Sequence, residues 1–343
     1  MEEIVLARST KTERLYRELE SRILVLDGAM GTMIQRHRLQ EEDFRNEALK
    51  DHQTNLKGNS DILSLTRPEI IKEIHAQYLA AGADIIETNT FSGTTIAQED
   101  YDLKHMVDDI NIESARIAKE VADEFSNKEP HKPRFVAGAM GPTNRTASLS
   151  PDVNDPGFRA VTFNELKTAY KQQALGLMKG GADILLVETV FDTLNAKAAL
   201  FAIEEVKEEL EQDIPTMVSG TITDASGRTL SGQTTEAFLV SVSHIPLLSI
   251  GLNCALGAKE LTPYLKTLSE KSQTYVSAHP NAGLPNEFGA YDQTAEEMVE
   301  LIEGFLDQKY LNIVGGCCGT TPEHISAIAE AAGQFQPRTI ITL

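Results

Sequence analysis

Short apolar runs recur along the 343-residue chain, and most of them end in Gly, Asn, Asp or Thr. Such runs, bounded by polar or turn-forming residues, are typical of buried β-strands. They predict eight strands, at residues 23–26, 84–87, 135–139, 184–188, 216–219, 249–252, 275–278 and 312–314.

Between many of these runs, apolar residues recur at helical spacing. The predicted helices cover residues 68–81, 110–125, 163–179, 196–210, 262–271 and 295–305, and Thr321-Pro322 begins a last one. Alternating strands and helices favour a parallel sheet with right-handed crossovers. Eight strands in this order predict an α/β fold of the (β/α)8 TIM barrel type, and a doubly wound parallel sheet is the alternative.

A further helix is predicted before the first strand, at residues 10–22, and we expect it to plug the bottom of the barrel. The expected division is a helical extension at 1–22, the barrel at 23–333 and a tail or linker at 334–343. A weak internal repeat, Gly82-Ala83-Asp84 and Gly181-Ala182-Asp183, precedes two of the predicted strands. It indicates two equivalent strand starts in a repeated β/α architecture.

The charge balance narrows the class of partner. Lys and Arg number 31 against 51 Asp and Glu, a formal net charge of −20. Such a chain repels the phosphates of nucleic acids and anionic membrane surfaces. No apolar stretch is long enough to span a bilayer. We therefore expect a cytoplasmic protein that binds neither nucleic acid nor membrane, and whose partner is a small molecule or another protein.

If the barrel is correct, the polar residues that follow its strands gather at one end, where barrel active sites are built. These residues include Asp27, Glu87, Glu188, Thr221, Asp224, Asn253 and His279. Asp27 and Glu188 are predicted to hold the ammonium group of an amino-acid substrate. Backbone amides of the glycine-rich 28–32 loop are predicted to bind its carboxylate. The alternatives are that Asp27 caps a turn and Glu188 forms a buried ion pair. His279 is expected to be a structural histidine with its hydrogen bonds satisfied.

The three cysteines are the most specific chemical signal. Cys317 and Cys318 are adjacent within a glycine-rich run, and Cys254 follows another predicted strand. Three cysteines cannot all pair, and two adjacent cysteines are poorly placed for an ordinary disulfide, so the pattern argues against a disulfide framework. Inert buried thiols are the other alternative. Three thiolates on zinc leave an open coordination position, as catalytic zinc sites do, and such a zinc favours a soft sulfur ligand.

Several motifs resemble the homocysteine S-methyltransferase family. They are Asp27-Gly28-Ala29-Met30-Gly31-Thr32, Glu87-Thr88-Asn89-Thr90-Phe91, Gly251-Leu252-Asn253-Cys254 and Gly315-Gly316-Cys317-Cys318-Gly319. Longer runs at residues 141–148, 150–153, 188–197 and 219–224 are similar to the homocysteine-binding module of cobalamin-dependent methionine synthases. The likeness extends from about Arg22 to about Ala332.

The resemblance implies a set of roles. The cysteines matching Cys254, Cys317 and Cys318 ligate one Zn²⁺ ion, and the sulfur of homocysteine takes the open position. Residues matching Asp27 and Glu188 hold the amino-acid end of homocysteine. The predicted substrate contacts are Asp27, Gly28, Ala29, Met30, Glu188 and Asn253. The thiolate of homocysteine then attacks an electrophilic methyl group, and methionine is formed.

The methyl donor implied by the resemblance is methylcobalamin, whose methyl group originates from methyltetrahydrofolate. The chain stops at Leu343, shortly after the barrel. We therefore expect an excised fragment or one subunit of a split enzyme, with cobalamin- and folate-binding modules or subunits as partners and no cobalamin bound by this chain alone. Two alternatives stay open: a methyltransferase that uses S-methylmethionine or betaine, and a zinc-buffering or thiol-redox protein.

Overall fold

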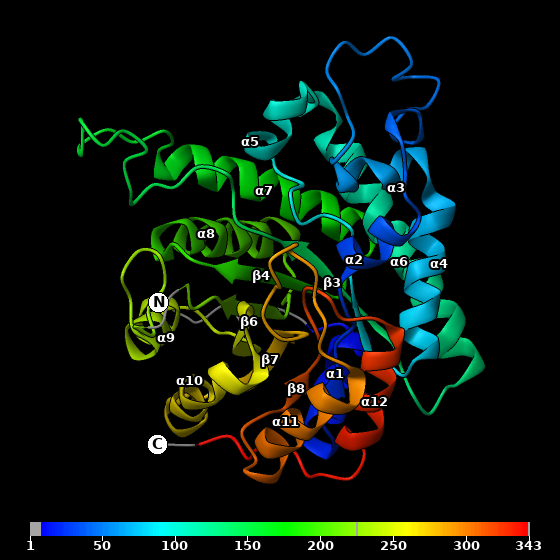
Figure 1. Cartoon of the computed structure of the whole chain (residues 1–343), viewed down its shortest axis with the longest axis vertical. Coiled ribbons are helices and arrows are strands. Elements are labelled where there is room, and N and C mark those ends of the chain that lie inside the picture. Colours follow the sequence, from blue (N-terminus) through cyan, green and yellow to red (C-terminus); the bar gives the residue numbers. More distant parts are fainter. Residues whose placement is uncertain (1–7, 224–225, 342–343) are drawn as a thin grey trace.

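Eight parallel strands form a nearly closed barrel surrounded by helices (Figure 1). The computed structural model describes residues 8–223 and 226–341. The strands are β1 (Leu24–Val25), β2 (Ile85–Glu87), β3 (Phe135–Met140), β4 (Ile184–Val190), β5 (Thr216–Gly220), β6 (Ser249–Gly257), β7 (Tyr275–Asn281) and β8 (Ile313–Val314). The order in the sheet is β1-β8-β7-β6-β5-β4-β3-β2. A single parallel bridge between Leu26 and Ile85 brings β1 beside β2, at the two ends of this order. The predicted (β/α)8 barrel is therefore confirmed.

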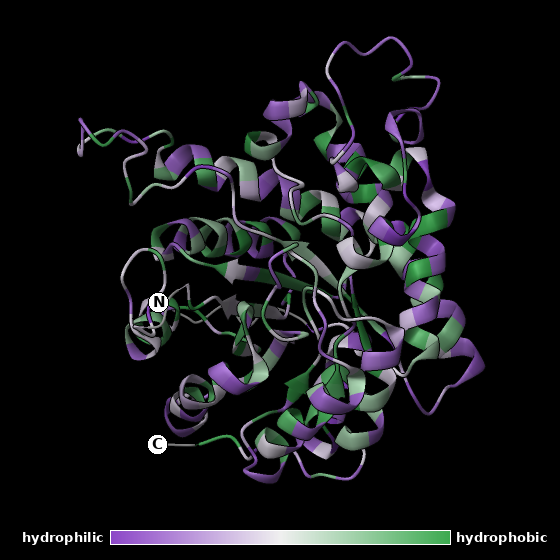
Figure 2. Ribbon diagram, in the orientation of Figure 1, coloured by the Kyte–Doolittle hydropathy of each residue, from purple (hydrophilic) through white to green (hydrophobic). Residues whose placement is uncertain are grey.

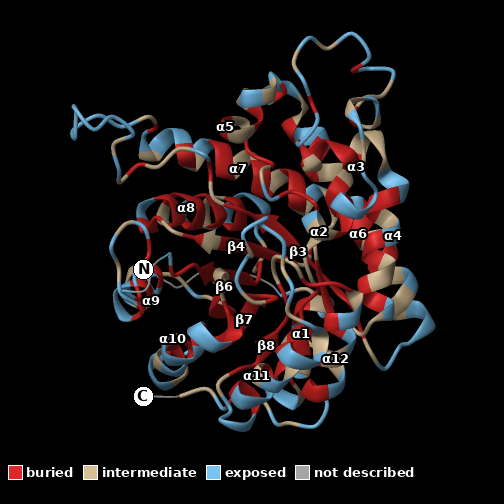
Figure 3. Cartoon of the chain, in the orientation of Figure 1, coloured by how far each residue is buried: buried red, intermediate tan, exposed pale blue. Residues whose placement is uncertain are grey.

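The helices cover the outside of the sheet and turn their apolar faces inward (Figures 2 and 3). The longer ones are α1 (Thr10–Ser21), α4 (Pro68–Ala80), α6 (Val107–Lys128), α7 (Phe163–Gly180), α8 (Thr193–Leu210), α9 (Thr235–Val242), α10 (Ala258–Lys271), α11 (Ala295–Asp307) and α12 (Pro322–Ala332). The shorter α-helices are α2 (Met30–Arg36), α3 (Leu63–Thr66) and α5 (Thr95–Gln98). Single 3₁₀ turns lie at Glu41–Phe44, Ser60–Ile62, Glu99–Tyr101 and Lys104–Met106.

The predicted helices are all present, but their ends differ. Helix α6 extends three residues beyond the prediction at each end, from Val107 to Lys128. Helix α10 begins at Ala258, four residues before the predicted start. Pro263 lies inside it and lacks the N–H that would make a hydrogen bond within the helix. Helix α9 was not predicted, because its eight residues bury only Thr235, Phe238 and Val242 and give a weak periodic signal.

Helix α1 closes the end of the barrel at which the strands begin. Its Leu15 and Leu19 are fully buried and belong to one cluster with Leu24, Phe135 and Ile184 from the starts of β1, β3 and β4. This packing agrees with the expected plug at the barrel bottom. The described helix begins at Thr10, and residues 1–7 of the predicted extension lie outside the described residues.

The repeated Gly-Ala-Asp motif has a common structural role. Asp84 and Asp183 each stand directly before a strand, and each carboxylate accepts a hydrogen bond from the backbone of the preceding strand in the barrel. The Val25 N–H donates to Asp84 Oδ2 at 2.9 Å, and the Val136 N–H donates to Asp183 Oδ2 at 2.9 Å. Asn312 does the same before β8, accepting from the Val276 N–H at 3.0 Å. These bonds fix the stagger between neighbouring strands.

The other end of the barrel, where the strands finish, carries the long connections. Residues 37–59 and 141–162 extend furthest from the barrel, and the segment between β7 and α11 passes over its middle (Figure 1). None of the helices within residues 8–223 and 226–341 is both long enough and apolar enough to cross a membrane.

Candidate active site

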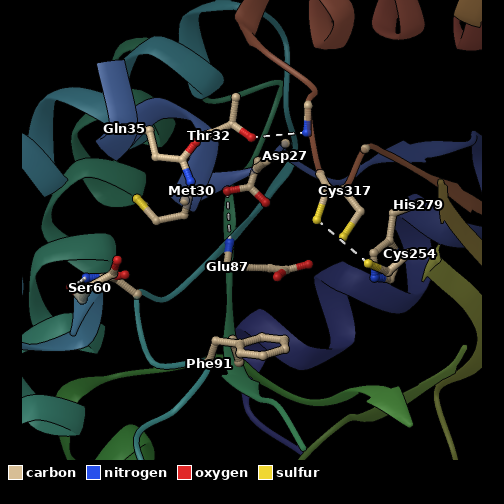
Figure 4. Close-up of a pocket in the computed structure, with 18 of the residues that line it drawn as sticks. Asp27, Met30, Thr32, Gln35, Ser60, Glu87, Phe91, Cys254, His279 and Cys317 are labelled. Carbon is tan, nitrogen blue, oxygen red and sulfur yellow. Dashed lines mark hydrogen bonds between the residues drawn. The ribbon is translucent and has the colours of Figure 1, made fainter. Parts of the chain in front are cut away.

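The three cysteines converge at the end of the barrel where the strands finish. Cys254 lies near the end of β6, and Cys317 and Cys318 follow β8 (Figure 4). Their Sγ atoms all lie within 4.8 Å of one another, and the Cys254 and Cys318 sulfurs are 3.7 Å apart. A tetrahedral zinc ion with Zn–S bonds of about 2.3 Å holds its sulfurs about 3.8 Å apart. The spacing of these thiols therefore fits a zinc ion bound by three cysteines.

An irregular backbone directs Cys254 toward the other two thiols. Cys254 and Ala255 have φ angles of 57° and 53°, in the left-handed region that non-glycine residues rarely adopt. The register between β6 and β7 shifts between Asn253 and Gly257. Strain of this kind persists where the surrounding structure holds it, and it is concentrated at functional sites.

Glycines allow the turn that carries Cys317 and Cys318. A Cβ atom on Gly316 would lie 2.5 Å from Thr320 Oγ1. That hydroxyl donates a hydrogen bond to the Cys317 carbonyl at 2.7 Å. The Cys317 N–H in turn donates to the Pro280 carbonyl at 2.8 Å. The close packing at Gly316 therefore holds the cysteine turn against the end of β7.

Asn253 supports the thiol cluster from behind. Its side-chain N–H₂ donates to Thr189 Oγ1 at 2.8 Å and lies 3.9 Å from Cys317 Sγ, while its carbonyl oxygen accepts from the Thr189 N–H at 3.0 Å. Asn253 is fully buried, and it does not line the cavity described below. Its geometry indicates that it orients Cys317, and direct contact with a substrate stays a prediction.

The thiols share negative charge. Hydrogen bonds from Cys254 and Cys317 lower the pKa of Cys318 to about 3. Hydrogen bonding to Cys254 and Cys318, together with burial, raises the pKa of Cys317 well above its ordinary value. Because like charges this close repel, one thiolate is stabilised at the expense of its neighbours. A cation among the sulfurs is what allows all three to ionise together.

Tyr291 is a site residue that the sequence pattern did not reveal. It lies on the segment between β7 and α11, and its hydroxyl is a hydrogen-bond partner of Cys318. Gly319, with a φ of 81°, packs against it so closely that an added Cβ would lie 2.3 Å from the Cβ of Tyr291. Tyr291 follows no strand end, so nothing in the strand pattern marked it.

Three carboxyl groups lie beside the thiols. Asp27 follows β1, Glu87 ends β2, and Glu188 lies in β4. Asp27 and Glu188 are only 2% and 4% exposed. The Glu87 N–H donates to Asp27 Oδ2 at 3.1 Å (Figure 4), and the side chains of Glu87 and Glu188 are hydrogen-bonded to each other. Asp27 Oδ1 is buried and has no hydrogen-bond partner among the described residues.

The alternative role of Glu188, as one member of a buried ion pair, is wrong, because the side chain of Glu188 is hydrogen-bonded to another acid, Glu87. Burial and the charge of Glu87 raise the pKa values of Asp27 and Glu188 well above the ordinary range. Burial also raises the pKa of Glu87 to about 7. No Lys or Arg within the described part of the chain pairs with any of the three. The three buried acids therefore have no compensating positive charge among the described residues.

One cavity of about 920 Å³ joins the thiols and the carboxyl groups. It is lined by all three cysteines, by Asp27, Glu87 and Glu188, and by the predicted contacts Gly28, Ala29 and Met30. The structure corrects one feature of the expected glycine-rich loop, because helix α2 already begins at Met30. The first N–H groups of a helix have no partner within it. The Ala29 N–H donates to Thr320 Oγ1 at 3.2 Å and so already has a partner.

His279 departs from the expected satisfied histidine. It is 1% exposed, and neither ring nitrogen has a hydrogen-bond partner in the described structure. It lies with Glu87 and Glu188 in a group whose polar atoms are within 4.8 Å of one another. Burial lowers its pKa to about 3, so the imidazole is neutral. Of the two other rim residues, Thr221 is buried outside the cavity, and Asp224 lies outside the described residues.

Solved structures with the same architecture include two methyltransferases. The chain is similar to metallated homocysteine methyltransferase MmuM from Escherichia coli, with a TM-score of 0.70, 22% identity, and coverage of 92% of this chain and 98% of that one. It is also similar to a B12-independent methionine synthase from Shewanella sp. W3-18-1 in complex with selenomethionine, with a TM-score of 0.51, 12% identity, and coverage of 92% and 97%. At these identities the likeness establishes the fold.

The barrel, with thiols and carboxyl groups around one cavity at the end where its strands finish, is that of a TIM-barrel enzyme. A model of the homocysteine S-methyltransferase family matches residues 24–332, which is most of the chain. The chain therefore belongs to the homocysteine S-methyltransferase family, and the resemblance found in its sequence is confirmed.

Proposed function

We propose that the protein transfers a methyl group to the thiol of homocysteine and forms methionine, with one zinc ion held by Cys254, Cys317 and Cys318. The observation that carries this proposal is the convergence of three thiols, from two separate strands, at the spacing of a zinc site. When bound, the zinc ion would keep the substrate thiol ionised, and so nucleophilic, at neutral pH.

The residues of the chain supply the rest of the chemistry. Asp27 and Glu188 bind the substrate ammonium, which brings the positive charge that their buried carboxyl groups lack. The free N–H groups at the start of α2, from Met30 onward, face the substrate carboxylate beside Gly28 and Ala29. Holding the amino-acid end at these two points aligns the sulfur with the incoming methyl group, and this alignment lowers the entropic part of the barrier.

We further propose that the methyl group comes from methylcobalamin carried by a separate module or subunit, to which it passes from methyltetrahydrofolate. The support is the similarity of the runs at 141–148 and 188–197 to the homocysteine-binding module of cobalamin-dependent methionine synthases. The cavity of about 920 Å³ is also much larger than homocysteine, which leaves space for a donor. The partners and the place in methionine biosynthesis, like the cytoplasmic location, stay predictions.

The test is a donor panel. Zinc-loaded protein is incubated with homocysteine and either methylcobalamin, S-methylmethionine or betaine, and methionine is quantified. We expect methionine with methylcobalamin only. Turnover with S-methylmethionine or betaine alone would replace the proposed donor. Zinc binding without methionine formation from any donor would support a zinc-buffering or thiol-redox protein instead.

A further inference from the structure

Two segments of the chain carry the two ends of the proposed substrate site. Residues 27–32 follow β1 and include Asp27 and the start of α2, where the amino-acid end of homocysteine is proposed to bind. Residues 316–321 follow β8 and carry two of the three thiols. The two segments lie beside each other because β1 and β8 are paired in the barrel.

One buried hydroxyl group joins these segments. Thr320 is fully buried and does not line the cavity. Its Oγ1 accepts a hydrogen bond from the Ala29 N–H at 3.2 Å and donates one to the Cys317 carbonyl at 2.7 Å. A hydroxyl group can do both at once, because it has one donor and two acceptor positions. Thr320 therefore links a predicted substrate contact directly to the backbone of a proposed zinc ligand.

Two more hydrogen bonds cross between the segments. The Gly319 N–H donates to Thr32 Oγ1 at 3.0 Å (Figure 4), and the Gly316 N–H donates to the Asp27 carbonyl at 3.1 Å. Both donors belong to the cysteine turn, and both acceptors belong to the segment that follows β1. Together with Thr320, these bonds hold the two segments at a fixed separation.

Tyr78 supports the same contact from a helix outside the sheet. It is fully buried on α4, and its hydroxyl lies 3.1 Å from the carbonyl oxygens of both Ala29 and Thr320. A Cβ atom on Gly28 would lie 2.8 Å from Thr320 Oγ1 and 2.8 Å from Tyr78 Cε1. Since close-packed interiors transmit a displacement to their neighbours, the segment after β1 has little room to move independently of the cysteine turn.

The fixed separation limits the length of the ligand. A ligand held at two points gains from both contacts only if its length matches the distance between them. In homocysteine two methylene groups separate the α-carbon from the sulfur, and in cysteine there is only one. If the thiols and the amino-acid segment cannot approach each other, cysteine cannot reach both. A site of fixed length therefore favours the longer amino acid.

We propose that Thr320 is a positioning residue that sets the chain-length specificity of the site. Its hydroxyl group fixes the distance between the thiols and the segment that binds the amino-acid end, and so selects an α-amino acid with its thiol on the γ-carbon over one with its thiol on the β-carbon. This inference rests on the proposed function of the site. Thr320 contacts neither end of the substrate and acts through the backbone of Ala29 and Cys317.

Three substitutions in the full zinc-loaded chain test this role. Thr320→Val removes the hydroxyl group and keeps the branched shape, Thr320→Ser keeps the hydroxyl group as the matched control, and Tyr78→Phe removes only the supporting hydroxyl. Homocysteine affinity is measured by titration calorimetry in a buffer of constant free zinc, and weaker cysteine binding is measured by competition with homocysteine. Neither measurement needs a methyl donor. Zinc content and thermal unfolding are recorded for each variant.

The measured quantity is the ratio of homocysteine affinity to cysteine affinity. Loss of zinc or of folded protein lowers both affinities together, so a merely structural role does not move the ratio. We expect Thr320→Val to lower the ratio by about 10-fold, because discrimination by one methylene group is typically about 10- to 200-fold. Tyr78→Phe should lower it by about 3-fold, and Thr320→Ser should keep it within about 2-fold of the original chain. If Thr320→Val does not fold or hold zinc, Tyr78→Phe decides the question.

Three results would contradict the inference. An unchanged ratio in Thr320→Val and Tyr78→Phe would show that these hydroxyl groups do not set the length of the ligand. An equal loss in Thr320→Ser would show that the hydroxyl group is not the cause. Equal affinities for the two amino acids in the unsubstituted chain would show that the site has no length preference. Failure of the proposed function is distinct from all three, because the unsubstituted chain would then bind no homocysteine.

Discussion

Replacement of Cys317 by serine isolates the metal-binding role of one thiol from the stability of the barrel. Serine keeps the size and the backbone contacts of residue 317, namely its N–H bond to Pro280 and the bonds that its carbonyl accepts from Thr320. It exchanges a thiolate for a neutral hydroxyl. Structural zinc sites with four ligands bind with roughly 10–16 kcal/mol, or about 2.5–4 kcal/mol for each ligand. Since about 1.4 kcal/mol corresponds to a tenfold change, we expect Cys317→Ser to bind zinc about 100- to 1000-fold more weakly.

The assay is zinc content after equilibration in a series of buffered free-zinc concentrations, together with thermal unfolding. The melting temperature should fall by no more than about 3 °C, because less than about 1 kcal/mol of packing is lost. Val153→Ser is the matched control, since Val153 is 95% exposed on the 141–162 connection and touches none of the thiols. Unchanged zinc affinity in Cys317→Ser would show that Cys317 is not a zinc ligand. Unfolding of the barrel on loss of zinc would contradict the prediction too, because the ion would then be structural.

Three further substitutions test the packing at Gly316, the opposite end of the barrel and the buried acids. Gly316→Ala places a Cβ 2.5 Å from Thr320 Oγ1. We therefore expect the free energy of unfolding to fall by about 1–3 kcal/mol and zinc to bind more weakly. Unchanged stability and zinc affinity would show that the turn at Gly316 has room for a methyl group. Leu19→Ala removes a fully buried side chain at the opposite end of the barrel. It should lower the free energy of unfolding in urea by about 2–5 kcal/mol and leave the zinc content unchanged. Loss of zinc would show that packing at this end of the barrel affects the thiols at the other. Burial raises the pKa of Glu87 from 4.5 to about 7, and burial together with the charge of Glu87 raises the pKa of Glu188 well above its ordinary value. Between pH 4.5 and about pH 7 the folded chain therefore holds more protons than the unfolded chain, so the free energy of unfolding falls as the pH rises. Glu87→Gln should accordingly gain stability relative to the unsubstituted chain between pH 5 and pH 7, and parallel stability curves would rule this out.

The barrel was predictable because its signals are local and repeated. Each strand is a short apolar run, and each long helix shows its buried positions at helical spacing. The exceptions are α2, α3, α5 and α9. They are short helices with few buried residues, so their periodic pattern is weak. The start of α10 was misplaced because Pro263, which usually lies near a helix start, is here tolerated inside the helix.

The candidate site was predictable only where chemistry follows a strand end. That rule brought together Cys254, Cys317 and Cys318, which the structure places within 4.8 Å of one another. It gave no signal for Tyr291, which reaches Cys318 from the middle of a long connection. Nor did it foresee the hydrogen bond between Glu87 and Glu188, because pairing between side chains depends on rotamers and on the stagger of the barrel.

The metal centre itself is most directly tested by X-ray absorption at the zinc edge, recorded on the zinc-loaded chain with and without the selenium analogue of homocysteine. We expect three sulfur ligands from the protein in both samples, and a selenium neighbour bonded to zinc only when the analogue is present. A fourth protein ligand that persists in the presence of the analogue, with no selenium in the first coordination shell, would contradict this expectation.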